Sequence, residues 1–100
     1  MPKIILKNDR YKHMRGGQSR LLQISCRECG QQICRYQKDG PGTLRRMYID
    51  RMSDVSISLL AKALVCPEGH LLGTKMIYEK EDRLAFRLFV SAIAKKIVKV

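Results

Sequence analysis

Two short motifs constrain this chain more than any other feature: CRECG at residues 26–30 and CPEGH at residues 66–70. Two soft ligands separated by two residues can reach the same metal ion when the backbone makes a tight turn, and a following Gly eases that turn. Zinc prefers four such ligands, chiefly thiolate and imidazole, in a tetrahedral arrangement. The two motifs therefore predict the two halves of one zinc site.

Cys26, Cys29 and Cys66 are three of the predicted zinc ligands, and His70 is the fourth. The second motif carries Gly where a second Cys is typical, and the longer reach of imidazole lets the following His take that place. Cys34 is the competing fourth ligand, although a predicted strand points it less easily back to the turn. Its other interpretation is a small buried apolar side chain. We expect one Zn²⁺ ion in a Cys3His set.

Ligation by four protein groups predicts a closed, structural site. A catalytic zinc needs an open position for water and an adjacent acid or base. Glu28 and Glu68 lie inside the two motifs and are the candidates for that role, but such turn positions are usually exposed. We therefore expect no enzymatic activity.

The composition predicts one small domain with a modest core. Hydrophobic residues make up 45% of the 100 residues, aromatic residues only 6%, and Trp is absent. A metal site would supply stability that such a core lacks. The chain shows no secretion signal and no apolar run approaching the roughly 18 residues of a membrane span. We expect a cytoplasmic protein without membrane contact, in which cysteines bind metal more readily than they form disulfides.

Short apolar or alternating runs predict β-strands that lead into and out of the two motifs. A strong turn signal, KDGPG at residues 38–42, predicts a hairpin between the second and third of these strands. Residues 91–98 stay open between strand and helix, because Phe89, Ile93 and Ile97 also show helical spacing. The expected strands cover residues 21–25, 31–37, 43–50, 62–65 and 84–90.

These elements predict a mainly β fold. We expect a small zinc-centred antiparallel β domain over residues 21–100, of the β-tent or zinc-ribbon kind, with a possible short C-terminal helix. Residues 1–20 are expected to form a basic N-terminal arm.

The charge distribution predicts a polyanionic partner. The net charge is +11, from 20 Lys and Arg against 9 Asp and Glu, and residues 1–25 and 83–100 each carry +5. Basic side chains interleaved with tyrosines can contact phosphates and stack on bases. We therefore expect binding to RNA, DNA or a ribonucleoprotein. The predicted contacts are Arg35, Tyr36, Arg45, Arg46, Tyr48 and Arg51.

The motifs also resemble those of the zinc-centred β-tent group, which includes yippee proteins, the cereblon-type ligand-binding domain and type B methionine sulfoxide reductases. The resemblance rests on the CxxC-Gly motif, the strand-rich middle and LLGTKMIY at residues 71–78. It implies an alternative function as a protein-interaction or small-ligand adaptor. The chain departs from the group in lacking a fourth motif Cys, the Trp of the ligand cage and any Cys after Cys66, so reductase activity is not expected. A plain zinc ribbon remains the other possible fold.

Overall fold

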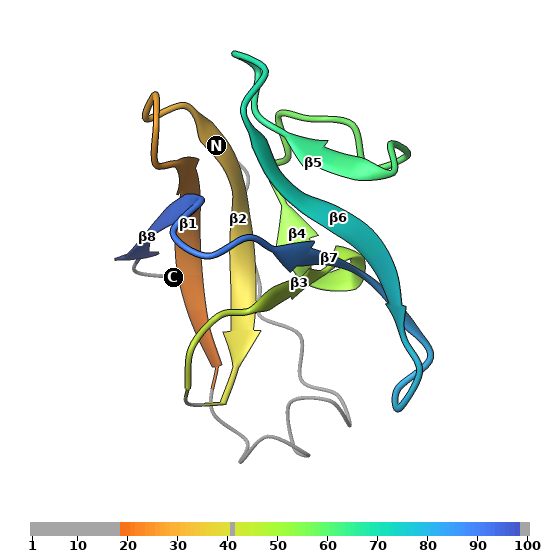
Figure 1. Ribbon diagram of the computed structural model, residues 1–100. Helices are drawn as coiled ribbons and strands as arrows, with labels where there is room; N and C mark the ends of the chain where they lie inside the picture. Colours follow the sequence, from red (N-terminus) through yellow and green to blue (C-terminus); the bar gives the residue numbers. More distant parts are fainter. Residues whose placement is uncertain (1–18, 41, 99–100) are drawn as a thin grey trace.

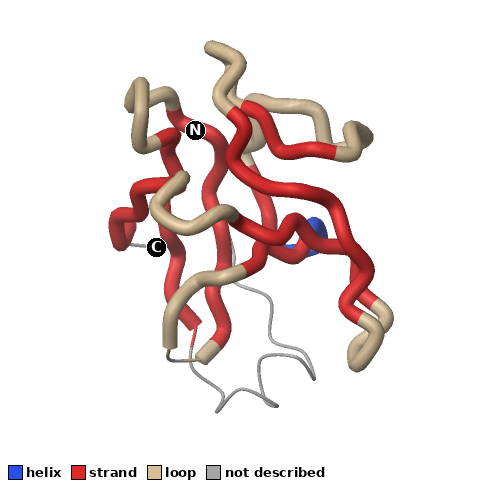
Figure 2. The backbone as a smooth tube through the Cα atoms, in the orientation of Figure 1, coloured by secondary structure: helices blue, strands red, loops and turns tan. Residues whose placement is uncertain are grey.

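The computed structural model describes residues 19–40 and 42–98, and within them it is mainly β, as predicted (Figures 1 and 2). Eight strands and one short 3-10 helix, η1, make up the described chain. In order they are β1 (Ser19–Cys26), β2 (Gln32–Asp39), β3 (Arg46–Tyr48), η1 (Ile49–Arg51), β4 (Met52–Ser53), β5 (Ala63–Val65), β6 (Leu71–Tyr78), β7 (Arg83–Leu88) and β8 (Ile93–Val98).

The strands form two antiparallel sheets of four strands each. The first sheet has the order β4-β2-β1-β8, and the second has the order β3-β7-β6-β5. Two hairpins carry the predicted metal motifs: β1 pairs with β2 in the first sheet, and β5 pairs with β6 in the second. Each sheet therefore contributes one motif, and Figure 1 shows the two connecting turns at the same end of the molecule.

The core lies between the sheets and is mostly aliphatic. The first sheet contributes Ile24 and Ile33, and the second contributes Leu64, Leu72 and Phe86, all with at most 1% of their surface exposed. Alternation in β1 explains part of this pattern, since successive side chains of a strand point to opposite faces. Cys26 and Cys66 belong to the same buried cluster, so the predicted metal ligands continue directly from the hydrophobic core.

Gly73 allows β6 and β7 to pack closely. A Cβ at this position would lie 2.4 Å from the backbone oxygen of Arg87. Only glycine leaves room for that approach. The Gly in the 71–78 segment is therefore explained by strand packing in the second sheet.

Buried charges tie η1 to the second sheet. The Arg83 guanidinium is 4% exposed and contacts Asp50 of η1 at 2.6 Å and Glu81 at 3.0 Å. It also lies 3.7 Å from the centre of the Tyr48 ring. Because the carboxylates and the ring surround it, this buried charge is well compensated.

The predicted hairpin at residues 38–42 is wrong. Strand β3 does not pair with β2 but crosses to the second sheet, where it pairs with β7. The partner of β2 on that side is the two-residue strand β4. Turn residues indicate where the chain changes direction. Which strands then pair is determined by packing between segments that are far apart in the sequence.

Residues 91–98, which the sequence left open between strand and helix, contain strand β8 at Ile93–Val98, and it pairs with β1. The strands predicted at residues 21–25 and 31–37 correspond to β1 and β2. Those predicted at 62–65 and 84–90 correspond to β5 and β7, but β5 begins at Ala63 and β7 ends at Leu88, and of residues 43–50 only Arg46–Tyr48 form a strand. The predicted N-terminal arm lies outside the described residues up to residue 18, and Ser19 and Arg20 open β1. The described part of the chain holds no helix long and apolar enough to cross a membrane.

Candidate metal centre

The first motif forms a tight turn at the end of β1. The backbone N–H of Gly30 donates to the Cys26 carbonyl over 2.8 Å, and the N–H of Cys26 donates to the Gln31 carbonyl over 2.9 Å. Gly30 has a φ of 76°, a conformation that glycine adopts without steric cost. These bonds fold Cys29 back toward Cys26, as a metal knuckle requires.

The second motif forms a turn of the same kind between β5 and β6. The N–H of Gly69 donates to the Cys66 carbonyl, and the N–H of Cys66 donates to the His70 carbonyl, each over 2.9 Å. Gly69 has a φ of 92°. A left-handed backbone at this position favours Gly over Cys, which gives a physical reason why the candidate fourth ligand is the next residue, His70.

The two turns bring four ligand atoms together. The Sγ atoms of Cys26, Cys29 and Cys66 and a ring nitrogen of His70 all lie within 4.8 Å of one another. The sulfurs of Cys29 and Cys66 are 3.7 Å apart. Nδ1 of His70 lies 3.7 Å from the sulfur of Cys26 and 3.2 Å from that of Cys66.

These separations suit one tetrahedral zinc ion. Two sulfurs that each lie about 2.3 Å from zinc at tetrahedral angles are about 3.8 Å apart, and a sulfur and a nitrogen are about 3.6 Å apart. The observed sulfur–sulfur distance of 3.7 Å between Cys29 and Cys66 is close to the first value. The sulfur–nitrogen distance of 3.2 Å between Cys66 and His70 is slightly shorter than the second. The donor set, three sulfurs and one imidazole, is also one that zinc prefers.

Local hydrogen bonds prepare Cys66 to be a thiolate. Burial opposes its ionisation, but the backbone N–H and imidazole of His70 and the backbone of Glu68 lower the pKa of the thiol to about 6. The N–H of His70 approaches its sulfur at 3.3 Å. A thiolate is the form of Cys that binds metal.

Cys29 experiences the opposite balance. Its bond with the Gln31 backbone lowers the pKa, but burial and the neighbouring sulfurs of Cys26 and Cys66 together raise it above the ordinary value. Several thiolates in one place repel each other unless a cation joins them. The crowding of sulfurs is therefore suited to a bound cation.

Cys34, the competing ligand, lies outside this group. It is fully buried within β2. Burial, with a smaller contribution from Asp54, raises the pKa of its thiol to about 12. Cys34 packs in the hydrophobic core as a small apolar side chain. All four cysteines are free of disulfide bonds.

Three of the residues predicted to contact nucleic acid are buried. Tyr36 is 2% exposed, Tyr48 7% and Arg51 4%. The Tyr36 hydroxyl accepts a 2.9 Å hydrogen bond from the backbone N–H of Tyr48. Arg51 donates from Nε to Asp39 over 2.9 Å. In this structure neither ring is available to stack on a base.

The other three predicted contacts do not form one surface. Arg45 is exposed. The Arg46 guanidinium lies 4.0 Å from the centre of the Tyr78 ring. Arg35 is half-buried, and its Nε lies 3.9 Å from a carboxylate oxygen of Asp54. The six residues are therefore divided among the core, the second sheet and the β2–β4 edge.

Sequence reasoning missed a basic hollow at the opposite end of the sheets. Its basic residues are Arg20, Lys38 and Lys95. The signal was present, because a basic residue stands two positions before an apolar one in Arg20–Leu22 and again in Lys95–Ile97, so each pair lies on one face of its strand. That pattern becomes readable only when both strands are known to lie in one sheet.

Comparisons with protein-family models, with curated proteins and with solved structures find no match to this chain. The geometry of the described residues therefore carries the functional argument.

Proposed function

We propose that this protein is a small non-enzymatic module that binds one structural zinc ion through Cys26, Cys29, Cys66 and His70. The observation that carries the proposal is the approach of these four ligand atoms to within 4.8 Å of one another. Their residues come from two hairpins in different sheets. The zinc ion then joins the two sheets at one end of the molecule, as in a β-tent or zinc-ribbon arrangement.

A structural role is favoured over a catalytic one. Three thiolates and one imidazole complete a tetrahedron and leave no position for water or substrate. Glu28 and Glu68, the nearest candidates for an acid or base, are exposed in the turns. Zinc adds folding free energy to a domain whose core is small.

Substitution of single cysteines tests this role. Cys26→Ser removes one of the predicted ligands, and we expect it to lose zinc and to unfold. Cys34→Ala is the matched control, because it removes a buried cysteine outside the group, and it should keep about one zinc per chain. Metal analysis by mass spectrometry and far-UV circular dichroism measure both results. A folded Cys26→Ser protein with unchanged zinc content would refute the proposal.

For the partner we propose RNA, DNA or a ribonucleoprotein. Support comes from the net charge of +11 and from exposed basic residues such as Arg20, Arg45, Lys95 and Lys96. Because the tyrosines are buried, the contacts would be mainly to phosphates, with strong salt dependence and weak sequence preference. Gel-shift titrations with single-stranded and duplex oligonucleotides at two salt concentrations test this directly. Absence of salt-sensitive binding would remove this partner.

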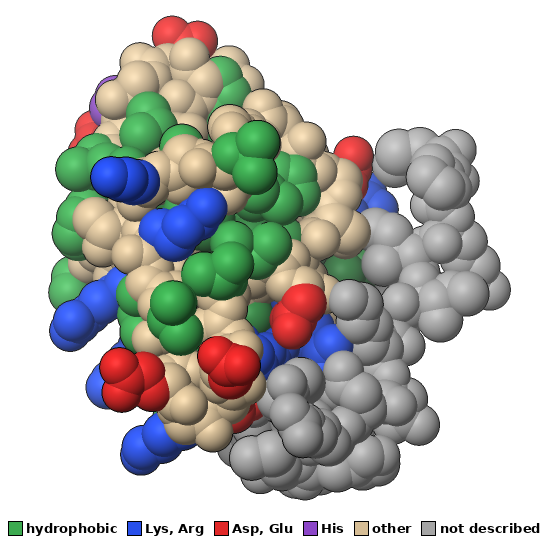
Figure 3. Space-filling model, turned by 90° about the vertical axis from the view of Figure 1, so that its right-hand side faces the viewer, with side chains coloured by type: hydrophobic (Ala, Val, Ile, Leu, Met, Phe, Trp, Pro, Cys, Tyr) green, Lys and Arg blue, Asp and Glu red, His purple; other side chains and the backbone are tan. Residues whose placement is uncertain are grey.

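A second candidate function, protein-interaction adaptor, is favoured by an apolar face. Leu60, Ile77 and Leu84 are 92%, 58% and 50% exposed. They belong to segments around β5, β6 and β7, and Figure 3 shows hydrophobic side chains gathered across the side of the molecule where β5 and β6 lie. Exposed apolar patches commonly mark contacts with partners. If neither RNA nor DNA binds, this face is the first surface to test.

A further inference from the structure

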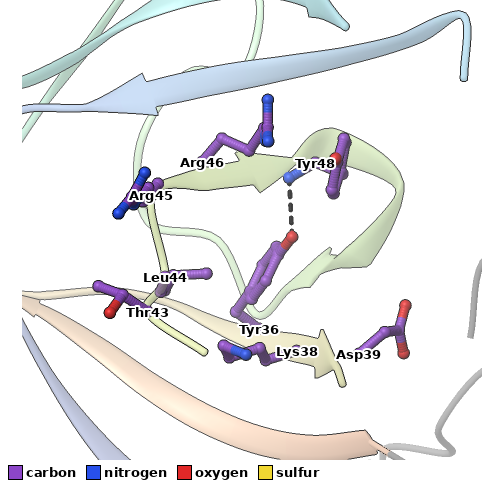
Figure 4. A pocket seen from close by; sticks show the side chains of 8 residues that line it. All are labelled: Tyr36, Lys38, Asp39, Thr43, Leu44, Arg45, Arg46 and Tyr48. Atoms are coloured by element: carbon purple, nitrogen blue, oxygen red, sulfur yellow. Dashed lines mark hydrogen bonds between the residues drawn. The ribbon is translucent and has the colours of Figure 1, made fainter. Parts of the chain in front are cut away.

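Two neighbouring hollows lie at the ends of β1 and β2 remote from the metal motifs. The larger, of about 390 Å³, is lined by Arg20, Leu22, Lys38, Gly40, Gly42, Lys95 and Ile97. The smaller, of about 290 Å³ (Figure 4), is lined by Lys38, Asp39 and Arg45 among other residues. Lys38 borders both hollows. We refer to the pair as the basic groove.

The register of the first sheet builds the larger hollow. Leu22 of β1 lies opposite Ile97 of β8. Arg20 lies opposite Lys38 of β2 on the same face. Lys95 follows on that face two residues before Ile97. An apolar pair is thus bordered by cations at both ends.

The charges of the groove favour an anion. Lys38, opposite Arg20, donates from Nζ to the Gly40 carbonyl over 2.7 Å, and the exposed cations of the groove are Arg20, Arg45 and Lys95. In the described part of the chain, Arg20, Arg45 and Lys95 have no ion pair with an acidic residue. An anion in the groove would supply the counter-charge that these three side chains lack among the described residues.

The carboxylate of the acidic residue that borders the smaller hollow is already hydrogen-bonded to other side chains. Asp39 accepts hydrogen bonds from Ser19 at 2.6 Å, from Gln37 at 3.0 Å and from Arg51 at 2.9 Å. These bonds hold the pKa of its carboxyl below the ordinary value even though burial acts against ionisation. Asp39 therefore belongs to the wall of the groove, and its charge is directed to Arg51.

We propose that the basic groove binds a small organic anion that combines an apolar body with one carboxylate, sulfonate or phosphate group. Leu22 and Ile97 would contact the apolar body, and Lys95, at one end of this apolar pair, would bind the charged group. The two hollows have the size of small-ligand sites. The groove provides no tyrosine ring on which a base could stack, because the rings of Tyr36 and Tyr48 are buried.

This site is separate from the metal centre. Arg20 lies six positions from Cys26 along β1, a distance of about 20 Å along an extended strand. Lys95, opposite Ile24, lies nearer but on β8. The groove inference does not depend on nucleic-acid binding. Loss of anion binding by a zinc-loaded, folded variant would therefore be distinguishable from failure of the zinc site.

A pair of fluorescent probes tests the ligand chemistry. 8-Anilinonaphthalene-1-sulfonate carries a sulfonate, and N-phenyl-1-naphthylamine is the same fluorophore without it. We expect the zinc-loaded protein to bind the sulfonate at one saturable site and the neutral probe at least about tenfold more weakly. Equal binding of the two probes would overturn the proposal.

A matched pair of variants tests the location. Lys95→Glu reverses a charge that lines the groove, whereas Lys96→Glu makes the same change on the other face of the same strand. Both side chains are exposed, so both variants should fold with one zinc. We expect Lys95→Glu to weaken sulfonate binding about tenfold and Lys96→Glu less than about twofold. Equal losses of affinity in the two variants would mean that only the net charge of the protein matters, and would overturn the assignment of the site to the groove.

Displacement identifies the source of the anion. Free decanoate should displace the sulfonate probe, and the neutral alcohol decanol should not. Displacement by anionic vesicles or by a single-stranded oligonucleotide, but not by decanoate, would overturn the proposal of a small free anion.

Discussion

The two ends of the paired sheets differ in how their charges and polar groups are arranged. At one end, two tight turns place three sulfurs and an imidazole within 4.8 Å of one another. At the other end, strands β1, β2 and β8 place Arg20, Lys38 and Lys95 around an apolar surface. The first end gathers groups that a cation would join, and the second gathers cations that an anion would join.

This difference separates stability from recognition. A metal at the first end would hold the sheets together and leave no ligand position free. The second end is held by the Asp39–Arg51 pair, whose side chains are 4% and 1% exposed, and keeps Arg20 and Lys95 exposed beside it. Changes at the first end should therefore alter folding, and changes of the exposed cations at the second should alter binding.

Removal of metal should have the largest effect. Structural zinc contributes on the order of 10 kcal/mol in small domains, which is comparable to the whole stability of a protein of this size. We expect excess chelator to abolish the cooperative thermal transition seen by circular dichroism, and added zinc to restore it. An unchanged Tm after verified metal removal would show that the two ends do not differ in this way.

Asp39→Asn should have the next largest effect. It removes the carboxylate from a buried pair with Arg51 and should cost about 3 kcal/mol at neutral pH by urea unfolding. Because the pKa of Asp39 is lowered by folding, its contribution is complete above about pH 4, the unfolded value, and is lost as pH falls through the folded value. The difference in free energy of unfolding between Asp39→Asn and the original protein should therefore shrink as the pH falls.

Asp82→Asn is the control for that experiment. It makes the same chemical change at an exposed turn position and should cost less than about 0.5 kcal/mol. Zinc content should stay at one per chain in both variants. A loss of zinc in Asp39→Asn would mean that the two ends are coupled.

Gly73→Ala tests the packing of the second sheet beside the metal end. The added Cβ would meet the Arg87 backbone at 2.4 Å, so β6 and β7 must separate. We expect a loss of about 2 kcal/mol by urea unfolding, with zinc still bound. The exposed neighbour Thr74→Ala should change stability by less than about 0.5 kcal/mol. Equal stabilities of the two variants would contradict the close approach of the strands.

Tyr36→Phe should have the smallest effect. It removes the acceptor for the Tyr48 N–H and should cost about 1 kcal/mol without changing anion or nucleic-acid affinity. Chemical denaturation and the sulfonate titration measure the two quantities. A stable variant with weakened nucleic-acid binding would support base contact by this tyrosine instead of its buried role.

Much of the metal centre could be predicted from sequence because the information is local. Spacing places Cys26 beside Cys29 and Cys66 beside His70, and the chemistry of the ligands implies that the pairs meet. The sequence left Cys34 open as the competing ligand, and only the structure places it in the core, outside the group of four. The β class followed similarly from short alternating runs.

The errors concern long-range partners. The turn at residues 38–42 predicts a reversal, but β3 pairs with β7, about 40 residues later. Residues 93–98 form a strand because the edge of β1 accepts them, although their spacing also suits a helix. Tyr36 and Arg51 were predicted to contact nucleic acid because basic residues and tyrosines interleave in this part of the sequence. Neighbours in space, Tyr48 and Asp39, determine their burial.

The central claim is tested most directly by X-ray absorption at the zinc edge on the purified, zinc-loaded protein. The proposed site, made of Cys26, Cys29, Cys66 and His70, predicts one zinc per chain with three sulfur ligands at about 2.3 Å and one nitrogen at about 2.0 Å. Four sulfur ligands would contradict the assignment of His70 and make Cys34 the fourth ligand. A folded protein that binds no zinc would contradict the account altogether.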